Sequence, residues 1–130
     1  MEGKEVPLGE FHFQNRRRHI RVPFSDSVQF QLKKTNRCGG TLALDISEGG
    51  IRIHFFEFFP PNTELTVQIP LPPYKVVDCP GRVVWIQKAR FADYYFAGIE
   101  FFELETAVLA RKEIRQFIES FMKGVVKRNG

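Results

Sequence analysis

The chain has 130 residues, the size of one domain, and 43% of them are hydrophobic, which is enough for a core without disulfide or metal staples. The net charge of +4 comes from 19 basic and 15 acidic residues, an excess too small for a chain that coats nucleic acid along its length. Fourteen phenylalanines against one tryptophan favour a β-rich fold with an aromatic core.

The cysteines and histidines indicate neither a disulfide framework nor a metal centre. Cys38 and Cys79 are the only cysteines, and the three histidines are scattered without metal-ligand spacing. We therefore expect free, reduced thiols. No apolar run approaches the roughly 20 residues of a membrane span, and no signal-peptide segment follows the charged N-terminus. A soluble, cytoplasmic protein is the resulting expectation.

The first third of the chain begins without regular structure and then becomes strand-like. Residues 1–14 contain glycine and proline without periodicity, which predicts a flexible arm. A basic cluster follows, and Pro23 favours extended backbone directly after it. The first strand is expected at 27–33, and a turn is expected at 36–40.

Alternating apolar and polar residues predict six short strands in all, separated by turns rich in glycine and proline. This pattern is typical of a small antiparallel barrel or sandwich. The single tryptophan, Trp85, is expected in its core. The strands are expected at residues 27–33, 41–46, 51–55, 65–69, 81–87 and 94–102.

Beyond Glu103 the apolar residues recur with a helical period, which predicts one amphipathic C-terminal helix. Thr106 is expected at its cap or first turn, and Gly124 at its end. The chain therefore divides into a flexible arm at 1–14, one folded domain at 15–123 and a tail at 124–130.

Arg16, Arg17 and Arg21 form a basic cluster within six residues. Guanidinium forks bond phosphate oxygens or the O6/N7 edge of guanine, and they stack on bases. On extended backbone Arg17 and Arg21 lie on the same side about 13 Å apart, the scale of a dinucleotide. Taken alone, a solvated basic run is the commoner interpretation of such a cluster.

A second motif, Asp45-Ile46-Ser47-Glu48-Gly49-Gly50, lies between two predicted strands. Its Asp and Ser side chains can cap a tight turn, in which the glycines allow positive φ. The same carboxylate can also accept from the N1–H and N2–H₂ edge of guanine, and bare glycine backbone lets a ligand approach. Alone this motif is also more simply a capped hairpin, but its position one strand after the arginines favours a binding site.

The two motifs together resemble the PilZ domain, a widespread bacterial receptor for cyclic di-GMP. Arg17 to Arg21 fits Arg-x-x-x-Arg, and Asp45 to Gly50 fits Asp/Asn-x-Ser-x-x-Gly. The resemblance runs from about residue 15 to about residue 122. It implies a six-stranded antiparallel PilZ-type β-barrel with one C-terminal helix, and an N-terminal arginine loop that wraps the ligand against the barrel.

Carried over by position, the resemblance implies a role for each motif residue. Arg17 and Arg21 would hold phosphate and the guanine edge, while Asp45 and Ser47 would contact a guanine. Gly50 would keep the turn open.

Arg16 extends the first motif, and in this family an arginine there favours an intercalated ligand dimer. We therefore expect two cyclic di-GMP per chain. No catalytic constellation presents itself, so the chain is expected to be a receptor without cofactor and not an enzyme. It is expected to be a monomer or weak dimer and to act on a protein partner when the ligand orders segment 14–22. The C-terminal helix and the bend at Phe55–Phe59 are the expected docking surfaces.

Two alternatives remain open at this stage. A basic β-barrel could bind RNA or single-stranded DNA through exposed aromatic residues and arginines. A PilZ-like subunit could also act through protein contacts alone, without binding a nucleotide.

Overall fold

The computed structural model describes residues 19–73 and 75–129, which form seven strands followed by helical structure. A short 3₁₀ helix, η1 (Glu105–Ala107), leads into the long helix α2 (Val108–Asn129). The strands are β1 (Val22–Pro23), β2 (Ser27–Leu32), β3 (Cys38–Ser47), β4 (Gly50–Phe55), β5 (Glu64–Leu71), β6 (Lys75–Lys88) and β7 (Tyr95–Phe101).

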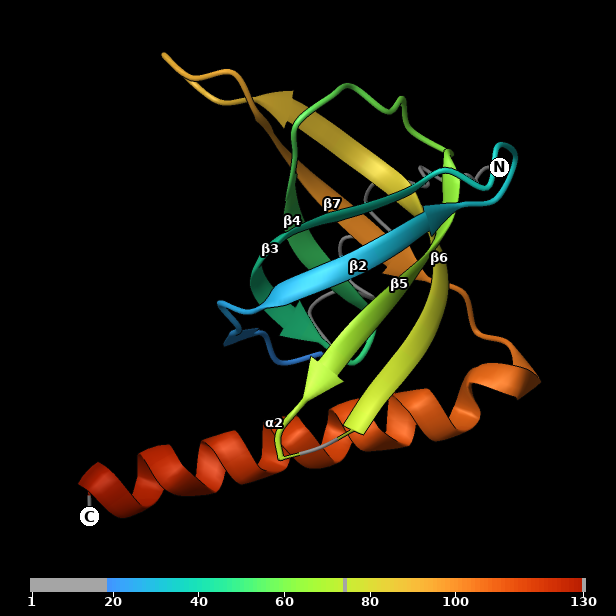
Figure 1. Cartoon of the computed structure of the whole chain (residues 1–130). Coiled ribbons are helices and arrows are strands. Elements are labelled where there is room, and N and C mark those ends of the chain that lie inside the picture. Colours follow the sequence, from blue (N-terminus) through green and yellow to red (C-terminus); the bar gives the residue numbers. More distant parts are fainter. Residues whose placement is uncertain (1–18, 74, 130) are drawn as a thin grey trace, which may run out of the picture.

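The strands close into a six-stranded antiparallel barrel. The sheet order is β1-β3-β2-β5-β6-β7-β4, and an additional pairing between β3 and β4 completes the ring. The two-residue strand β1 adds to the outer edge of β3, where Val22 pairs with Ile46. The predicted barrel with one C-terminal helix is confirmed, and α2 lies across one end of it (Figure 1).

Alternation of apolar and polar residues gives the barrel its inner and outer faces. In β5 the residues Leu65, Val67, Ile69 and Leu71 are all buried, with more exposed residues between them. In β4 the buried residues Ile51, Ile53 and Phe55 alternate in the same way with outward-facing Arg52 and His54. Successive side chains of a strand point to opposite faces, so this pattern fills the interior.

The turn between β2 and β3 is earlier than the sequence suggested. Gly39 and Gly40 lie within β3 and pair with Phe30 and Gln29 of β2. A Cβ at Gly39 would come within 2.7 Å of the Phe30 ring, so a glycine is required for close packing here. The positive φ of 57° falls instead on Asn36, a residue that tolerates the left-handed region.

Strand β6 also begins earlier than predicted, at Lys75 instead of Gly81. Its first half pairs with β5 alone, because the pairing with β7 begins only at Gly81. Pro80 lies in that half, where one side of the strand has no neighbouring strand in register. A proline is tolerated at such an edge position, and for that reason it did not end the strand.

Helix α2 packs on the barrel through one apolar face. Ile114 and Ile118 are buried in the core, and Phe117 meets Phe24 edge to face at 5.6 Å between ring centroids. The helix continues to Asn129, past its predicted end at Gly124. Thr106, expected at the cap, lies in η1. No helix among the described residues is long and apolar enough to cross a membrane.

The expected core position of Trp85 is wrong, and the aromatic bend after β4 is buried only in part. Trp85 is only half-buried and lies on the outside of the barrel, because it pairs with Gly98 on the outward-facing side of β7. In the bend after β4, Phe55 and Phe59 are buried while Phe56 and Phe58 are exposed. The bend therefore contributes to the core and also presents an aromatic surface.

Candidate ligand-binding site

The turn between β3 and β4 is built around Ser47, which is buried. Its Oγ accepts hydrogen bonds from the backbone N–H groups of Gly49 at 3.2 Å and Gly50 at 3.1 Å. Ser47 thus caps the turn, the simpler of the two interpretations of this motif. The hydroxyl's own contact to the Gly50 carbonyl is long, at 3.4 Å, and therefore weak.

Gly50 is needed for close approach of strands, not for an unusual backbone angle. A Cβ there would lie 2.3 Å from the carbonyl oxygen of Ile99 in β7. Among the described residues no glycine has a positive φ, so the turn does not use the left-handed region that its glycines would allow.

The structure joins the two sequence motifs through Arg21 and Asp45. Arg21 precedes β1, whose pairing with β3 aligns Val22 with Ile46 and brings the arginine beside Asp45. Arg21 Nη1 donates to Asp45 Oδ1 at 2.7 Å, across 24 residues of sequence. The carboxylate is largely buried and the guanidinium partly exposed.

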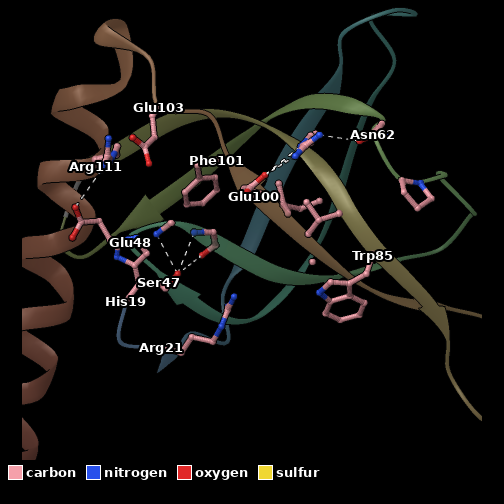
Figure 2. A pocket seen from close by; sticks show the side chains of 17 residues that line it. His19, Arg21, Ser47, Glu48, Asn62, Trp85, Glu100, Phe101, Glu103 and Arg111 are labelled. Carbon is pink, nitrogen blue, oxygen red and sulfur yellow. Dashed lines mark hydrogen bonds and ion pairs between the residues drawn. The ribbon is translucent and has the colours of Figure 1, made fainter. Parts of the chain in front are cut away.

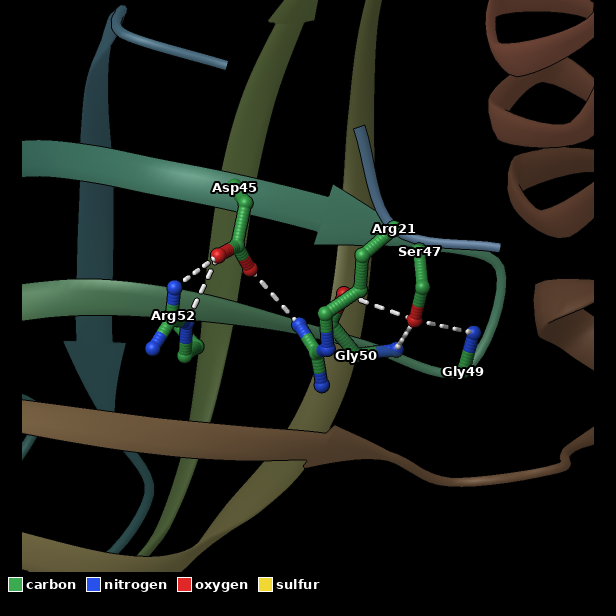
Figure 3. Close-up of polar contacts among 6 residues, drawn as sticks. All are labelled: Arg21, Asp45, Ser47, Gly49, Gly50 and Arg52. Carbon is green, nitrogen blue, oxygen red and sulfur yellow. Dashed lines mark hydrogen bonds and ion pairs between the residues drawn. The ribbon is translucent and has the colours of Figure 1, made fainter. Parts of the chain in front are cut away.

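Asp45 has a second basic partner that the sequence analysis did not assign. Arg52 is its register partner on β4 and donates from Nε to Asp45 Oδ2 at 2.6 Å. Figure 3 shows the carboxylate between Arg21 and Arg52, to the left of the Ser47 turn. The only sequence signal for Arg52 is its place on the polar side of a strand, which by itself does not indicate a partner.

A pocket of about 800 Å³ opens beside the motif turn. This volume lies within the range of roughly 300–1,000 Å³ of small-molecule sites. Residues from the N-terminal segment, the β3–β4 turn, β6, β7 and α2 line it (Figure 2). They include His19, Arg21, Ser47, Gly50, Arg82, Trp85 and Arg111.

Trp85 supplies the aromatic wall of this pocket. A Cβ at Gly98 would lie 2.2 Å from Trp85 Nε1 and 2.6 Å from Cε2, so the indole lies directly over this glycine. In Figure 2 the indole lies on the side of the pocket opposite α2. The sequence suggested a core residue, and only the register with Gly98 reveals the outward position.

Arg82 lies two strands from the motif turn and is held in place by its neighbours. Its Nε and Nη2 donate to Glu100 at 3.2 and 3.1 Å, and its Nη1 donates to Asn62 at 3.0 Å. The pocket thus carries fixed positive groups at more than one place along its length.

On the α2 side of the pocket, the lining residue Glu48 is held by ion pairs to the helix. Arg115 donates to Glu48 at 3.1 and 2.7 Å, and Arg111 lies 3.7 Å from the same carboxylate. The hydrogen bond from Arg115 lowers the pKa of Glu48, which His19 and Arg111 lower further by their charge.

Of the predicted site residues, Arg21, Asp45, Ser47 and Gly50 are brought together around the turn. Arg16 and Arg17 lie outside the described residues. Within residues 19–73 and 75–129 no group of His, Cys, Asp and Glu is arranged to hold a metal ion.

Comparison with protein-family models gives a match to the PilZ domain over residues 15–120. The chain belongs to the PilZ domain family. This assignment agrees with the barrel and with the contact between the two motifs. Comparison with curated proteins gives no match.

Solved PilZ structures have the same fold at low sequence identity. The inhibitor of motility MotI of Bacillus subtilis superposes with a TM-score of 0.69 at 22% identity, over 83% of this chain and 52% of MotI. The PilZ domain of YcgR from Escherichia coli, solved with c-di-GMP, gives a TM-score of 0.65 at 13% identity, over 88% of this chain and 97% of that domain. The MrkH–c-di-GMP complex of K. pneumonia gives a TM-score of 0.64 at 16% identity, over 87% of this chain and 55% of MrkH. The chain therefore spans about half the length of MotI and MrkH.

Proposed function

We propose that this PilZ domain is a non-catalytic receptor for cyclic di-GMP. The observation that carries the proposal is the 2.7 Å contact between Arg21 and Asp45, which unites the two motifs at a pocket of about 800 Å³. The family membership supports it, as do the YcgR and MrkH structures, which were solved with c-di-GMP.

The proposed roles follow the chemistry of each group. Arg17 and Arg21 hold phosphate and the guanine edge, because a guanidinium fork matches both. Asp45 accepts from a guanine, and Ser47 adds a contact through its hydroxyl hydrogen, which is only weakly engaged with the Gly50 carbonyl. Gly50 maintains the spacing of β4 and β7 on which the turn depends.

Trp85 gives the pocket a flat surface for a base. The indole is packed on one side against Gly98 and lines the pocket. Stacking of a base on an aromatic ring contributes about 1–3 kcal/mol. A planar purine is therefore a better match to this wall than a bare anion.

Signalling is proposed to pass through the N-terminal segment. His19 lies against the motif turn, since a Cβ at Gly49 would come within 2.8 Å of His19 Cδ2. Ligand held by Arg16, Arg17 and Arg21 orders segment 14–22 beside this turn and changes the surface offered to a protein partner. Helix α2, joined to the turn through Glu48, is the proposed docking element.

Isothermal titration with cyclic di-GMP tests the proposal. We expect saturable binding of two ligands per chain, and loss of binding in Arg21→Ala and Asp45→Ala. Arg90→Ala is the matched control, because Arg90 is exposed and lies outside the pocket. Arg16→Ala is expected to reduce the stoichiometry to one.

Two results would contradict the proposal. Absence of binding by the wild-type chain would remove it outright. Binding that tolerates many nucleic-acid sequences and weakens steeply with salt would favour the nucleic-acid alternative.

The ordering step has a test of its own. Equal hydrogen exchange of segment 14–22 with and without ligand would reject this step and leave the receptor proposal intact.

A further inference from the structure

Arg52 holds the second oxygen of the motif carboxylate. Its Nε donates to Asp45 Oδ2 at 2.6 Å, and its Nη2 pairs with the same oxygen. Arg21 Nη1 occupies Oδ1 at 2.7 Å. The carboxylate is thus flanked by one guanidinium on each side (Figure 3).

The two partners of this ion pair differ in exposure. The Asp45 side chain is 12% exposed, while the Arg52 side chain is 45% exposed. The contacts to Asp45 use Nε and Nη2 of Arg52 and do not involve Nη1. A guanidinium carries five N–H donors, so a group held in this way retains donors for a ligand.

Strand register places Arg52 next to the pocket wall. Arg52 pairs with Asp45 on β3 on one side and with Gly98 on β7 on the other. Gly98 pairs in turn with Trp85 on β6, and both line the pocket. A single row across four strands therefore runs from the carboxylate through Arg52 to the aromatic wall.

The chemistry of this row matches one edge of guanine. The Watson–Crick edge presents O6 as an acceptor beside two donors, N1–H and N2–H₂. Protein groups that complement this edge must present one hydrogen-bond donor beside two acceptors. A carboxylate supplies two acceptor oxygens with about four lone-pair sites, so it can accept from a guanidinium and from a base together.

We propose that Arg52 is a guanine-recognising residue, donating to O6 while Asp45 accepts from N1–H and N2–H₂ of the same base. The inference rests on the proposed function and adds a residue outside both sequence motifs. Arg52 suits this role better than Arg21, because it lies within a strand paired on both sides, whereas Arg21 precedes the two-residue strand β1.

A purely structural role for Arg52 makes a different prediction. If Arg52 only orients Asp45, its loss weakens every ligand that uses the carboxylate by the same factor. If Arg52 contacts O6, its loss weakens only ligands with a strong acceptor at that position. The atom at position 6 of the base therefore separates the two roles.

The experiment compares cyclic di-GMP with its 6-thioguanine analogue, which keeps N1–H and N2–H₂ but carries a weakly accepting sulfur at position 6. Wild-type protein is expected to prefer cyclic di-GMP by about 10- to 100-fold, in line with one well-made base contact. Arg52→Ala is expected to lose most of that preference and to bind the analogue nearly as well as wild type does.

Arg52→Lys guards against a folding defect, because a lysine keeps one charged bond to Asp45 but lacks the fork needed to serve O6 as well. It is expected to fold with a thermal midpoint close to that of wild type and to lose the same preference. Unchanged preference in both variants, or an equal loss for both ligands, would overturn the inference while leaving the receptor proposal standing. Failure of the wild-type chain to bind cyclic di-GMP would instead overturn the proposed function.

Discussion

Glu48, in the turn between β3 and β4, accepts two hydrogen bonds from Arg115 of α2, at 3.1 and 2.7 Å. The contact joins residues 67 positions apart and ties the motif turn to the C-terminal helix. Both oxygens of the carboxylate are engaged in a paired geometry, which is the strong form of this interaction. Because Arg115 lowers the pKa of Glu48, the contact also has a pH dependence.

The first prediction concerns that pH dependence. A carboxyl group whose pKa is lowered by folding stabilises the protein above its unfolded-state pKa, and the contribution disappears as pH falls through the folded-state pKa. Glu48→Gln should therefore lower the thermal midpoint at pH 7 and change it much less at pH 3. Thermal unfolding followed by circular dichroism measures both values.

Glu64→Gln is the matched control, because Glu64 pairs with Lys33 in an exposed ion pair on the barrel. Such pairs contribute little, so this variant should change the midpoint only slightly at either pH. An equal loss for Glu48→Gln at pH 7 and pH 3 would show that the charge of Glu48 does not matter.

The second prediction concerns the spacing of β4 and β7. Gly50→Ala places a Cβ 2.3 Å from the Ile99 carbonyl oxygen, so one strand must move. Forced overpacking of this kind costs about 1–3 kcal/mol, which urea unfolding would detect. Gly124→Ala is the control, since a Cβ there meets nothing within 4 Å, and alanine in a helix is favoured by up to about 1 kcal/mol. Equal stabilities of the two variants would refute the steric explanation.

The third prediction concerns the cysteines, which are both free. Cys38 is exposed, whereas burial raises the pKa of the Cys79 thiol to about 12. The thiolate is the reactive form, so at pH 8 an aromatic disulfide reagent should modify Cys38 in the native protein and Cys79 only after unfolding. Cys38→Ser should leave no rapidly reacting thiol, and rapid reaction of that variant would argue against the buried position of Cys79.

The sequence was sufficient to predict most of the barrel, because period-2 alternation marks a strand whatever its neighbours. The sequence-based strand boundaries are wrong at positions where pairing with a neighbouring strand, and not the residue type, determines the backbone conformation. Gly39 and Gly40 are residues typical of a turn, yet they lie in β3 because the Phe30 ring occupies the space above Gly39. Pro80 is typical of a strand end, yet β6 passes through it where only β5 is paired.

The candidate site likewise contains residues that a local sequence pattern identifies and residues that only strand register identifies. The motif residues Asp45 and Ser47 could be selected from the sequence, because their spacing is local. The contributions of Arg52 and Trp85 depend on which residues lie across from them, and register between strands far apart in sequence is not encoded in any one segment. Arg52 alternates in β4 like an ordinary barrel residue, whereas Trp85 follows a register shift after Val83 that breaks the alternation of β6.

The last prediction uses Trp85, the single tryptophan of the chain, as a reporter of the pocket. Gly98→Ala places a Cβ 2.2 Å from Trp85 Nε1, so the indole must leave the barrel surface. Displacement into water should shift its fluorescence emission to longer wavelength in ligand-free protein. Gly124→Ala, with open space around its Cβ, should leave the spectrum unchanged. If Gly98→Ala also leaves it unchanged in a folded protein, the indole does not lie over Gly98, and the aromatic wall of the pocket must be assigned elsewhere.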